Sequence, residues 1–287
     1  MANSKDVVVT GVSSGIGLGT TKVLVSKGFR VFGSVRKQAD ADRLQREFGD
    51  GFVPLVMDIT DADAVHQAAQ KVGSMIGDRN LVGLVNNAGV VVSGPLLYLR
   101  PSEYRRQLEV NMISPLVVIQ VFAPLLGTDR KRQGPTGRIV NISSSGAKVA
   151  IPLIGAYSAS KAGLEGMSDA LRQELMLFGI DVVIIEPGTV NTAMYDKGEK
   201  EDLSEFKQTE YWAAVQNFQK FIVTEARTNG LPPERLGEAV HVALTTAKPK
   251  ARYAVIPQRF KNWTLPRLLP TRILDAELAK QMKLTKL

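Results

Sequence analysis

The chain has 287 residues, of which 44% are hydrophobic, and its formal net charge at pH 7 is +8. It contains no cysteine and only two histidines, far apart in the sequence, so disulfides and thiolate catalysis are excluded and we predict no metal site. The densest basic cluster, 130–138, has no interleaved aromatic residues for base stacking, so we expect no nucleic-acid partner. The first residues show no secretory signal pattern, and we expect a cytoplasmic protein.

Short β-branched runs alternate with longer amphipathic segments along the chain. The strands are near-continuous apolar runs, which is typical of a sheet covered by helices on both faces. The alternation predicts a doubly wound parallel sheet in a three-layer α/β/α arrangement, with 1–287 as a single dinucleotide-binding catalytic domain. The predicted strands are 6–10, 30–35, 52–57, 81–86, 137–143, 180–186 and 252–257, and the predicted helices are 15–27, 39–48, 61–76, 102–126, 157–177 and 233–247.

A glycine-rich segment, TGVSSGIG from Thr10 to Gly17, joins the first strand to the first helix. Glycine lets such a turn adopt dihedral angles closed to other residues and lets the backbone approach a pyrophosphate closely. The free N–H groups at the start of the helix attract phosphate. A simple glycine-rich turn is the alternative, but the position between strand and helix favours a cofactor site that includes Gly11, Ser13, Ser14, Gly15, Ile16 and Gly17.

The end of the second strand indicates which dinucleotide is bound. An NAD site needs a carboxylate there to accept a hydrogen bond from the ribose 2′-hydroxyl, whereas this strand ends GSVRK. Arg36 is placed to pair with a 2′-phosphate, so we predict NADP(H) in preference to NAD(H), the alternative being a merely solvated strand end. Asp58, with Ile59 beside it, follows the third strand and could accept a hydrogen bond from the adenine amino group or begin the next helix.

Tyr157 and Lys161 form the second chemical signal. Residues four apart share one face of a helix, so the two side chains can point into one site. An ammonium one turn away stabilises a phenolate and lowers the phenol pKa from its reference value of about 10. The pair therefore suits proton transfer at the oxygen of an alcohol or ketone. An ordinary surface pair on a helix is the alternative, and three serines, Ser143 to Ser145, precede it in the sequence.

The glycine motif is followed, in this order, by Asn86-Asn87-Ala88-Gly89, Asn111, Ser144, Tyr157, Lys161 and Pro187-Gly188. Because of these residues and their order, the chain from Lys5 to about Pro257 resembles the short-chain dehydrogenases/reductases. Its single-domain branch has a Rossmann-type fold, and the finer match is to hydroxysteroid and retinol dehydrogenases. The resemblance implies that Ser144 orients the substrate oxygen, with Ser143 and Ser145 as close competitors, and that Lys161 binds the nicotinamide ribose. It further implies that Asn111 supports a proton relay, the alternative being a buried asparagine that satisfies a backbone group. It also implies that the cofactor contacts Asn87, Ala88, Gly89, Tyr157, Lys161, Pro187, Gly188, Val190 and Thr192.

Two further segments bear on the substrate. The segment 189–229 is too long for an ordinary connection between a strand and a helix, so we predict a lid with its own short helices. Its aromatic residues either wrap a lipophilic substrate or form the core of the lid. The tail, 260–287, is amphipathic and is expected to pack on the domain, with a subunit or membrane contact as alternatives.

Three functions fit these patterns. The first is an NADP(H)-dependent interconversion of a steroid- or retinoid-like alcohol and its ketone or aldehyde. The second is the reduction of 3-oxoacyl thioesters, and the third is a non-catalytic NADP-binding regulator. By resemblance we expect a homodimer or homotetramer formed through the helices 102–126 and 157–177.

Overall fold

The computed structural model describes residues 5–192 and 200–284. Its centre is a seven-stranded parallel sheet in the order β3-β2-β1-β4-β5-β6-β7, which confirms the predicted fold class. The strands are β1 (Lys5–Val9), β2 (Phe29–Val35), β3 (Phe52–Val56), β4 (Gly83–Asn86), β5 (Arg138–Ile142), β6 (Asp181–Pro187) and β7 (Arg252–Val255).

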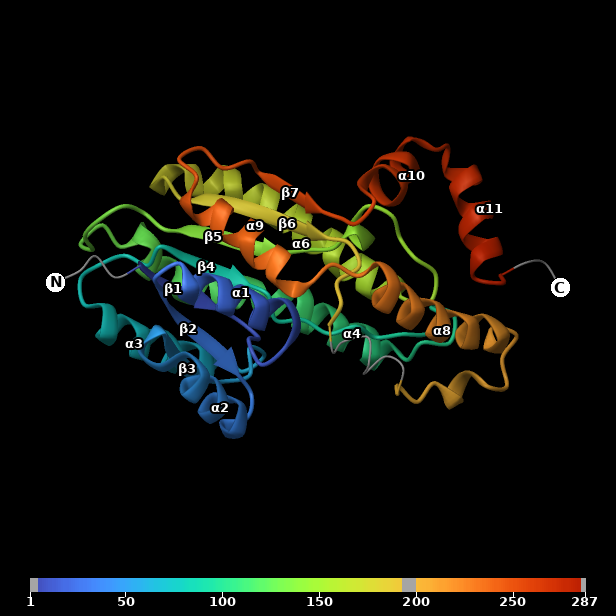
Figure 1. The fold of residues 1–287 in the computed structure, drawn as a ribbon, viewed down its shortest axis with the longest axis horizontal. Coiled ribbons are helices and arrows are strands. Elements are labelled where there is room, and N and C mark those ends of the chain that lie inside the picture. The colour runs from blue at the N-terminus through green and yellow to red at the C-terminus, as the bar shows by residue number, and fades with distance from the viewer. Residues whose placement is uncertain (1–4, 193–199, 285–287) are drawn as a thin grey trace.

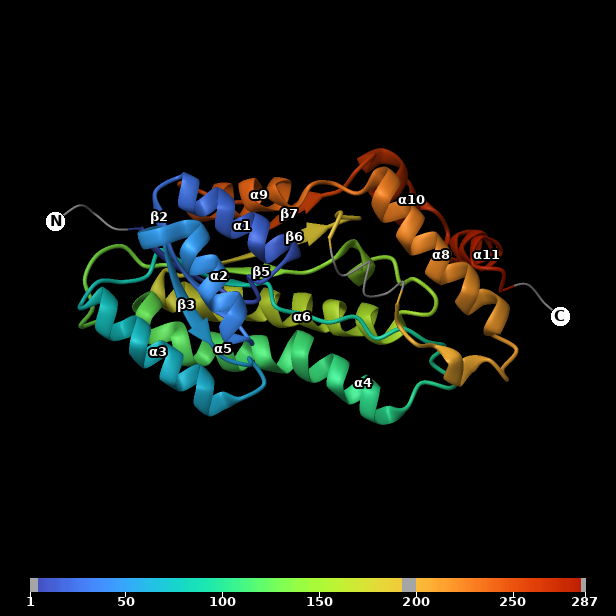
Figure 2. The same cartoon turned by 60° about the horizontal axis from the view of Figure 1, so that its bottom comes forward.

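Helices cover both faces of this sheet (Figure 1). One layer holds α1 (Gly15–Ser26), α2 (Gln38–Phe48) and α9 (Pro233–Thr245), which share an apolar core with the strands. The other holds α3 (Ala62–Ile76), α4 (Pro101–Leu108), α5 (Ser114–Ala123) and α6 (Gly155–Glu174). Figure 2 shows α1 and α9 on one side of the strands and α3, α5 and α6 on the other. The carboxyl ends of the parallel strands therefore meet at one sheet edge, where ligands of such folds bind.

The predicted helix 102–126 is interrupted in the structure. A π-helical turn, Glu109–Ile113, separates α4 from α5, and a second, Pro124–Thr128, follows α5. Pro115 and Pro124 have no N–H group for the regular helical ladder, which accounts for a change of register near each. Residues 101–128 are the one helical stretch of the described chain long and apolar enough to span a membrane, but Val118, Ile119 and Phe122 bury its apolar face in the domain core.

The lid region and the tail lie beyond the end of the sheet (Figure 1). The described part of the lid contains a 3₁₀ turn, Ser204–Phe206, and one long helix, α8 (Trp212–Asn229), where the sequence predicted short helices. The tail forms α10 (Leu265–Leu268) and α11 (Thr271–Gln281). Asn217 of α8 donates a hydrogen bond to the backbone oxygen of Gln281 (2.9 Å), and Met282 is buried in the lid core, so the end of the tail packs on the lid.

Candidate active site

The glycine-rich segment forms a tight cradle between β1 and α1. Gly11 and Gly15 have φ values of +70° and +60°, a conformation that side chains other than glycine rarely adopt. At Gly17 the requirement is space, because a Cβ would lie 2.2 Å from the Gly11 oxygen and 2.5 Å from Asn87 Nδ2. The first turn of α1 thus packs directly on the loop, with Ser13, Ser14 and Ile16 partly exposed beside it.

Neighbouring strands hold this cradle in place. Asn87, just after β4, donates from Nδ2 to the backbone oxygens of Thr10 (2.8 Å) and Gly11 (3.1 Å). The backbone N–H groups of Asn87 and Ala88 both donate to Thr10 Oγ1 at 3.0 Å. From β2, Ser34 Oγ accepts from the Gly11 N–H at 2.9 Å. Asn87 and Ala88 therefore build the cradle in the structure, and Thr10 and Ser34 are supporting residues that the sequence pattern did not single out.

Arg36 lies exposed just after β2, and within the described residues it makes no ion pair or side-chain hydrogen bond. Arg43 of α2, by contrast, donates to the Ser13 backbone oxygen (2.8 Å) and pairs with Asp40 and Glu47. Arg43 is a second cationic group beside the cradle that sequence reasoning missed, since its spacing on a helix looks like that of any surface arginine. Of these two arginines, Arg36 is the one without a partner among the described residues.

Asp58 lies exposed at the same sheet edge, and Ile59 beside it is buried. The Asp58 carboxylate accepts from the Thr60 N–H (3.0 Å) and hydroxyl (2.8 Å), whereas Asp61 caps α3 by accepting from the Ala64 N–H (3.1 Å). Asp61, rather than Asp58, therefore caps the start of α3.

The segment after β6 closes the cradle from the other side. Pro187 ends β6, and the Gly188 N–H donates to the Val255 oxygen at 3.0 Å. Val190 is buried and forms a bridge with Leu231. A Cβ on Gly15 would lie 3.3 Å from the Thr192 Cβ, so Thr192 borders the glycine-rich loop. These four residues, predicted by resemblance, lie at the same edge as the cradle.

Tyr157 and Lys161 lie on α6, and Ser144 lies just after β5. Ser144 Oγ accepts from the Gly146 N–H at 3.0 Å. A Cβ on Gly146 would lie 3.4 Å from Ser144 Oγ and 3.7 Å from Tyr157 Cε1, so the serine and the tyrosine ring both border Gly146. Lys161 is buried, donates from Nζ to the Ile142 backbone oxygen (2.8 Å) and lies 5.9 Å from the centroid of the Tyr157 ring. The structure therefore brings Ser144, Tyr157 and Lys161 together, and Ser143 faces elsewhere, with its hydroxyl donating to Glu165 (2.7 Å).

The protonation of this group differs from the sequence expectation. Burial raises the pKa of the Tyr157 phenol above its ordinary value, and the interaction with the Ser144 side chain opposes that rise. Burial also lowers the pKa of Lys161 to about 8, while the Glu165 carboxylate pulls it upward. The predicted lowering of the phenol pKa is wrong for this arrangement, because the pKa is raised and burial is the largest cause. At neutral pH the phenol therefore carries its proton.

Asn111 lies in the π-helical turn between α4 and α5 and is fully buried. Its side chain pairs with both backbone groups of Val90 at 2.9 Å, and Nδ2 also donates to Ser160 Oγ at 3.2 Å. A Cβ on Gly89 would lie 3.2 Å from Asn111 Oδ1 and 3.8 Å from Lys161 Nζ, so Gly89 lies between the two side chains. Asn111 has its polar groups satisfied by backbone, and its role in a relay stays a prediction.

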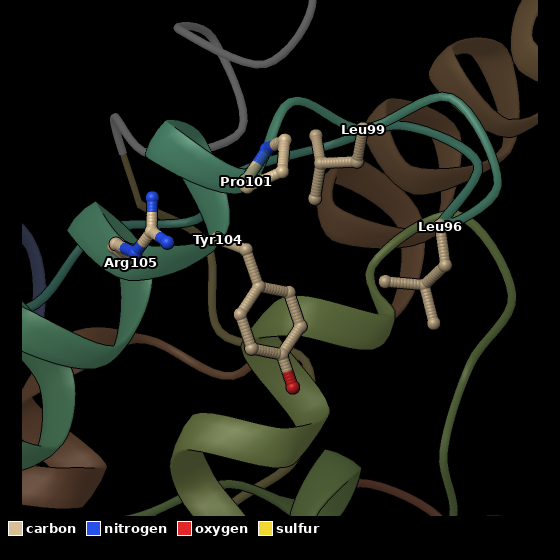
Figure 3. Close-up of a pocket in the computed structure, with 5 residues that line it drawn as sticks. All are labelled: Leu96, Leu99, Pro101, Tyr104 and Arg105. Atoms are coloured by element: carbon tan, nitrogen blue, oxygen red, sulfur yellow. The ribbon is translucent and has the colours of Figure 1, made fainter.

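The aromatic residues of the lid mostly form its own core. Phe206 and Phe218 are buried with Leu203 and Val215, and Tyr211, Trp212 and Phe221 pack against this cluster. Met194 and Tyr195, which belong to the lid predicted from the sequence, lie in 193–199, outside the residues that the structure describes. A separate pocket of about 330 Å³ is lined by Leu96, Leu99, Pro101, Tyr104 and Arg105 at the start of α4 (Figure 3). It contains none of the predicted site residues.

The described residues fit a phosphorylated dinucleotide. The cradle leaves no room for side chains at Gly11 and Gly17, and an unpaired guanidinium stands at the end of β2. No group of three or more histidine, aspartate or glutamate side chains in the described ranges could hold a metal ion. The chemistry that this arrangement could supply is proton transfer from a half-buried phenol beside the glycine cradle.

Comparisons with known proteins agree with this geometry. A family model described as short chain dehydrogenase matches residues 5–203. Over 276 residues, 96% of each chain, the sequence is 38% identical to the NADPH-dependent 3-dehydrocapnine reductase of Ornithobacterium rhinotracheale. It is 32% identical over 288 residues to retinol dehydrogenase 5 of Mus musculus, covering 96% of this chain and 88% of the relative. A solved short-chain dehydrogenase from Streptomyces avermitilis superposes with a TM-score of 0.75 at 25% identity, covering 99% and 98% of the two chains.

Proposed function

The chain belongs to the short chain dehydrogenase family and is an oxidoreductase, and we propose that it reduces the ketone or aldehyde group of a lipophilic substrate with NADPH. The observation that carries the proposal is the half-buried Tyr157 phenol, beside Ser144 and one helical turn from Lys161, at the sheet edge that holds the glycine cradle. The relatives named for NADPH, 3-dehydrocapnine and retinol support the cofactor and the substrate class.

The protein's own groups supply the proton side of the reaction. A bound nicotinamide cofactor supplies the hydride that forms the new C–H bond. Ser144 orients the substrate oxygen, and the Tyr157 O–H bond breaks as its proton passes to that oxygen, leaving a phenolate. The Lys161 ammonium and the Ser144 hydroxyl stabilise the phenolate until it is protonated again. A phenol whose pKa is raised by burial is protonated at neutral pH, which favours the reductive direction.

We also propose that the protein is a homodimer or homotetramer. Met176 and Leu177, in the 3₁₀ turn Leu175–Phe178 after α6, are 76% and 73% exposed, and Ile113, in the π-helical turn between α4 and α5, is 41% exposed. Large apolar side chains left exposed beside the two predicted interface helices support a subunit contact there. Sedimentation velocity measures the mass in solution, and a monomer at all concentrations would contradict this part.

The test is to follow NADPH and NADH oxidation by absorbance over steroid, retinoid, 3-oxoacyl thioester and small ketone substrates. We expect NADPH-dependent reduction of a lipophilic ketone or aldehyde, and a Tyr157→Phe variant whose kcat falls by about 10²- to 10⁴-fold while NADPH still binds. A preference for 3-oxoacyl thioesters would favour the second function. Tight NADPH binding without turnover of any substrate would overturn the catalytic proposal.

A further inference from the structure

Glu165 is a buried carboxylate one helical turn after Lys161 on α6. A buried charge is costly unless it is paired and hydrogen-bonded, and both of its oxygens have partners. Oε1 accepts from the Ser143 hydroxyl at 2.7 Å. Oε2 pairs with Lys148 Nζ at 2.7 Å and with Arg252 Nη1 at 3.0 Å. The carboxylate therefore joins α6 to a loop after β5 and to β7.

Two of these partners lie at the two ends of the segment that carries Ser144. Ser143 directly precedes Ser144, and Lys148 directly follows the 3₁₀ turn Ser145–Ala147. The turn packs against the phenol, since a Cβ on Gly146 would lie 3.7 Å from Tyr157 Cε1. Glu165 thus ties both ends of 143–148 to the helix that carries Tyr157 and Lys161.

The charges around Glu165 extend this connection to β7 and β6. Arg252 also pairs with Asp169, one turn further along α6, and its Nη1 lies 3.8 Å from Glu186 Oε1. That Glu186 oxygen is buried without a hydrogen-bond partner in the described chain. Lys161 faces Tyr157 and Glu165 on its own helix, and the Glu165 carboxylate favours its charged form against the effect of burial.

We propose that Glu165 is a positioning residue for the reaction: it fixes the segment that carries Ser144 against α6, the helix of Tyr157 and Lys161. This inference rests on the proposed function for its kinetic consequence. Its structural half, the ordering of 143–148 by Glu165, is independent of any substrate.

The test compares Glu165→Gln with two matched variants. Ser143→Ala removes one tie and leaves the carboxylate, and Asp169→Asn removes a partner of Arg252 that touches neither Ser143 nor Lys148. We expect Glu165→Gln to lower kcat by about 10- to 100-fold, as small misplacements of a catalytic group do, with the Kd for NADPH changed less than about threefold. We expect the alkaline limb of its pH–rate profile to move to lower pH, because the pKa of Lys161 falls without Glu165.

Ser143→Ala is expected to lower kcat without moving the pH profile, and Asp169→Asn to leave both at wild-type values. Hydrogen exchange of the 143–148 amides provides a readout that needs no substrate. Faster amide exchange in Glu165→Gln and Ser143→Ala, but not in Asp169→Asn, supports the proposal even if the wild-type protein turns over none of the substrates. The proposal would be overturned if the 143–148 amides exchange at the wild-type rate in Ser143→Ala and in a folded Glu165→Gln variant. It would also be overturned if all three variants exchange equally fast.

Discussion

At the scale of single residues, Arg36 is distinguished by its place directly after β2, where a 2′-phosphate would lie, and it has no partner within the described residues. If it pairs with that phosphate, replacing it with serine removes a charge-assisted contact to the cofactor but no contact within the fold. We expect Arg36→Ser to raise the KM for NADPH by about 10- to 100-fold, as loss of ~1.5–3 kcal/mol implies, with the KM for NADH and the Tm nearly unchanged. Steady-state kinetics with both cofactors and a thermal melt measure these effects.

Arg46→Ser is the matched control, because Arg46 is also exposed and lies on α2, the next element. Both variants lose one positive charge, so a general effect of net charge would appear in both. An equal rise in the NADPH KM for the two variants would contradict a specific role for Arg36.

At the scale of elements, the contact between α1 and its preceding loop depends on the absence of a side chain at Gly17. A methyl group there meets the Gly11 oxygen and Asn87 Nδ2, so α1 must move away from the cradle. We expect Gly17→Ala to destabilise the protein by about 1–3 kcal/mol, as overpacking does, and to weaken NADPH binding. Denaturant unfolding and fluorescence titration with NADPH measure the two losses.

Gly166→Ala provides the comparison, since a Cβ at Gly166 in α6 meets no atom within 4 Å. There alanine should stabilise the helix by about 0.5–1 kcal/mol and leave NADPH binding unchanged. If the two alanine variants bound NADPH equally well, the close approach at Gly17 would not be needed for the cofactor site.

The elements also show what sequence patterns can predict. Apolar runs between turn residues define all seven strands to within one or two residues, because a strand buried on both faces needs such a run. Pro115 marks a break in the predicted helix 102–126, but the π-helical turn at Asn111 could not be predicted from it alone, because Asn111 pairs with Val90, 21 residues away. In the sequence, Glu165 likewise looks like a surface residue of α6, because its partners come from other elements: Ser143 and Lys148 follow β5, and Arg252 lies on β7. The order of the site residues could be predicted, but the pKa of Tyr157 depends on how deeply the fold buries it.

At the scale of the whole molecule, burying the Lys161 ammonium lowers the free energy of unfolding of the protein. Its pKa in the fold is about 8, below the ordinary value of 10.5. Between these values the unfolded chain binds more protons than the folded one, so the free energy of unfolding rises with pH through this range. Below pH 8 the cost of burying the ammonium is fully present and amounts to roughly 3 kcal/mol.

Lys161→Met removes this cost but also the hydrogen bond to the Ile142 oxygen, which is worth about 1 kcal/mol. We therefore expect the variant to be inactive yet more stable than the wild type at pH 7. The difference in Tm should narrow as the pH rises above 8, where the wild-type lysine loses its proton. Thermal melts of both proteins over pH 6–10 measure this convergence.

Lys148→Met separates this effect from a general response to removing a lysine. Lys148 pairs with Glu165 at 2.7 Å, and its loss leaves a buried carboxylate with one partner fewer, so its Tm should fall at pH 7. A Lys161→Met variant less stable than the wild type at every pH would show that the buried ammonium stabilises the fold. Opposite shifts in Tm for the two lysine variants would instead mean that the domain gives up stability at Lys161, which in the proposed reaction stays buried beside Tyr157 to stabilise the phenolate.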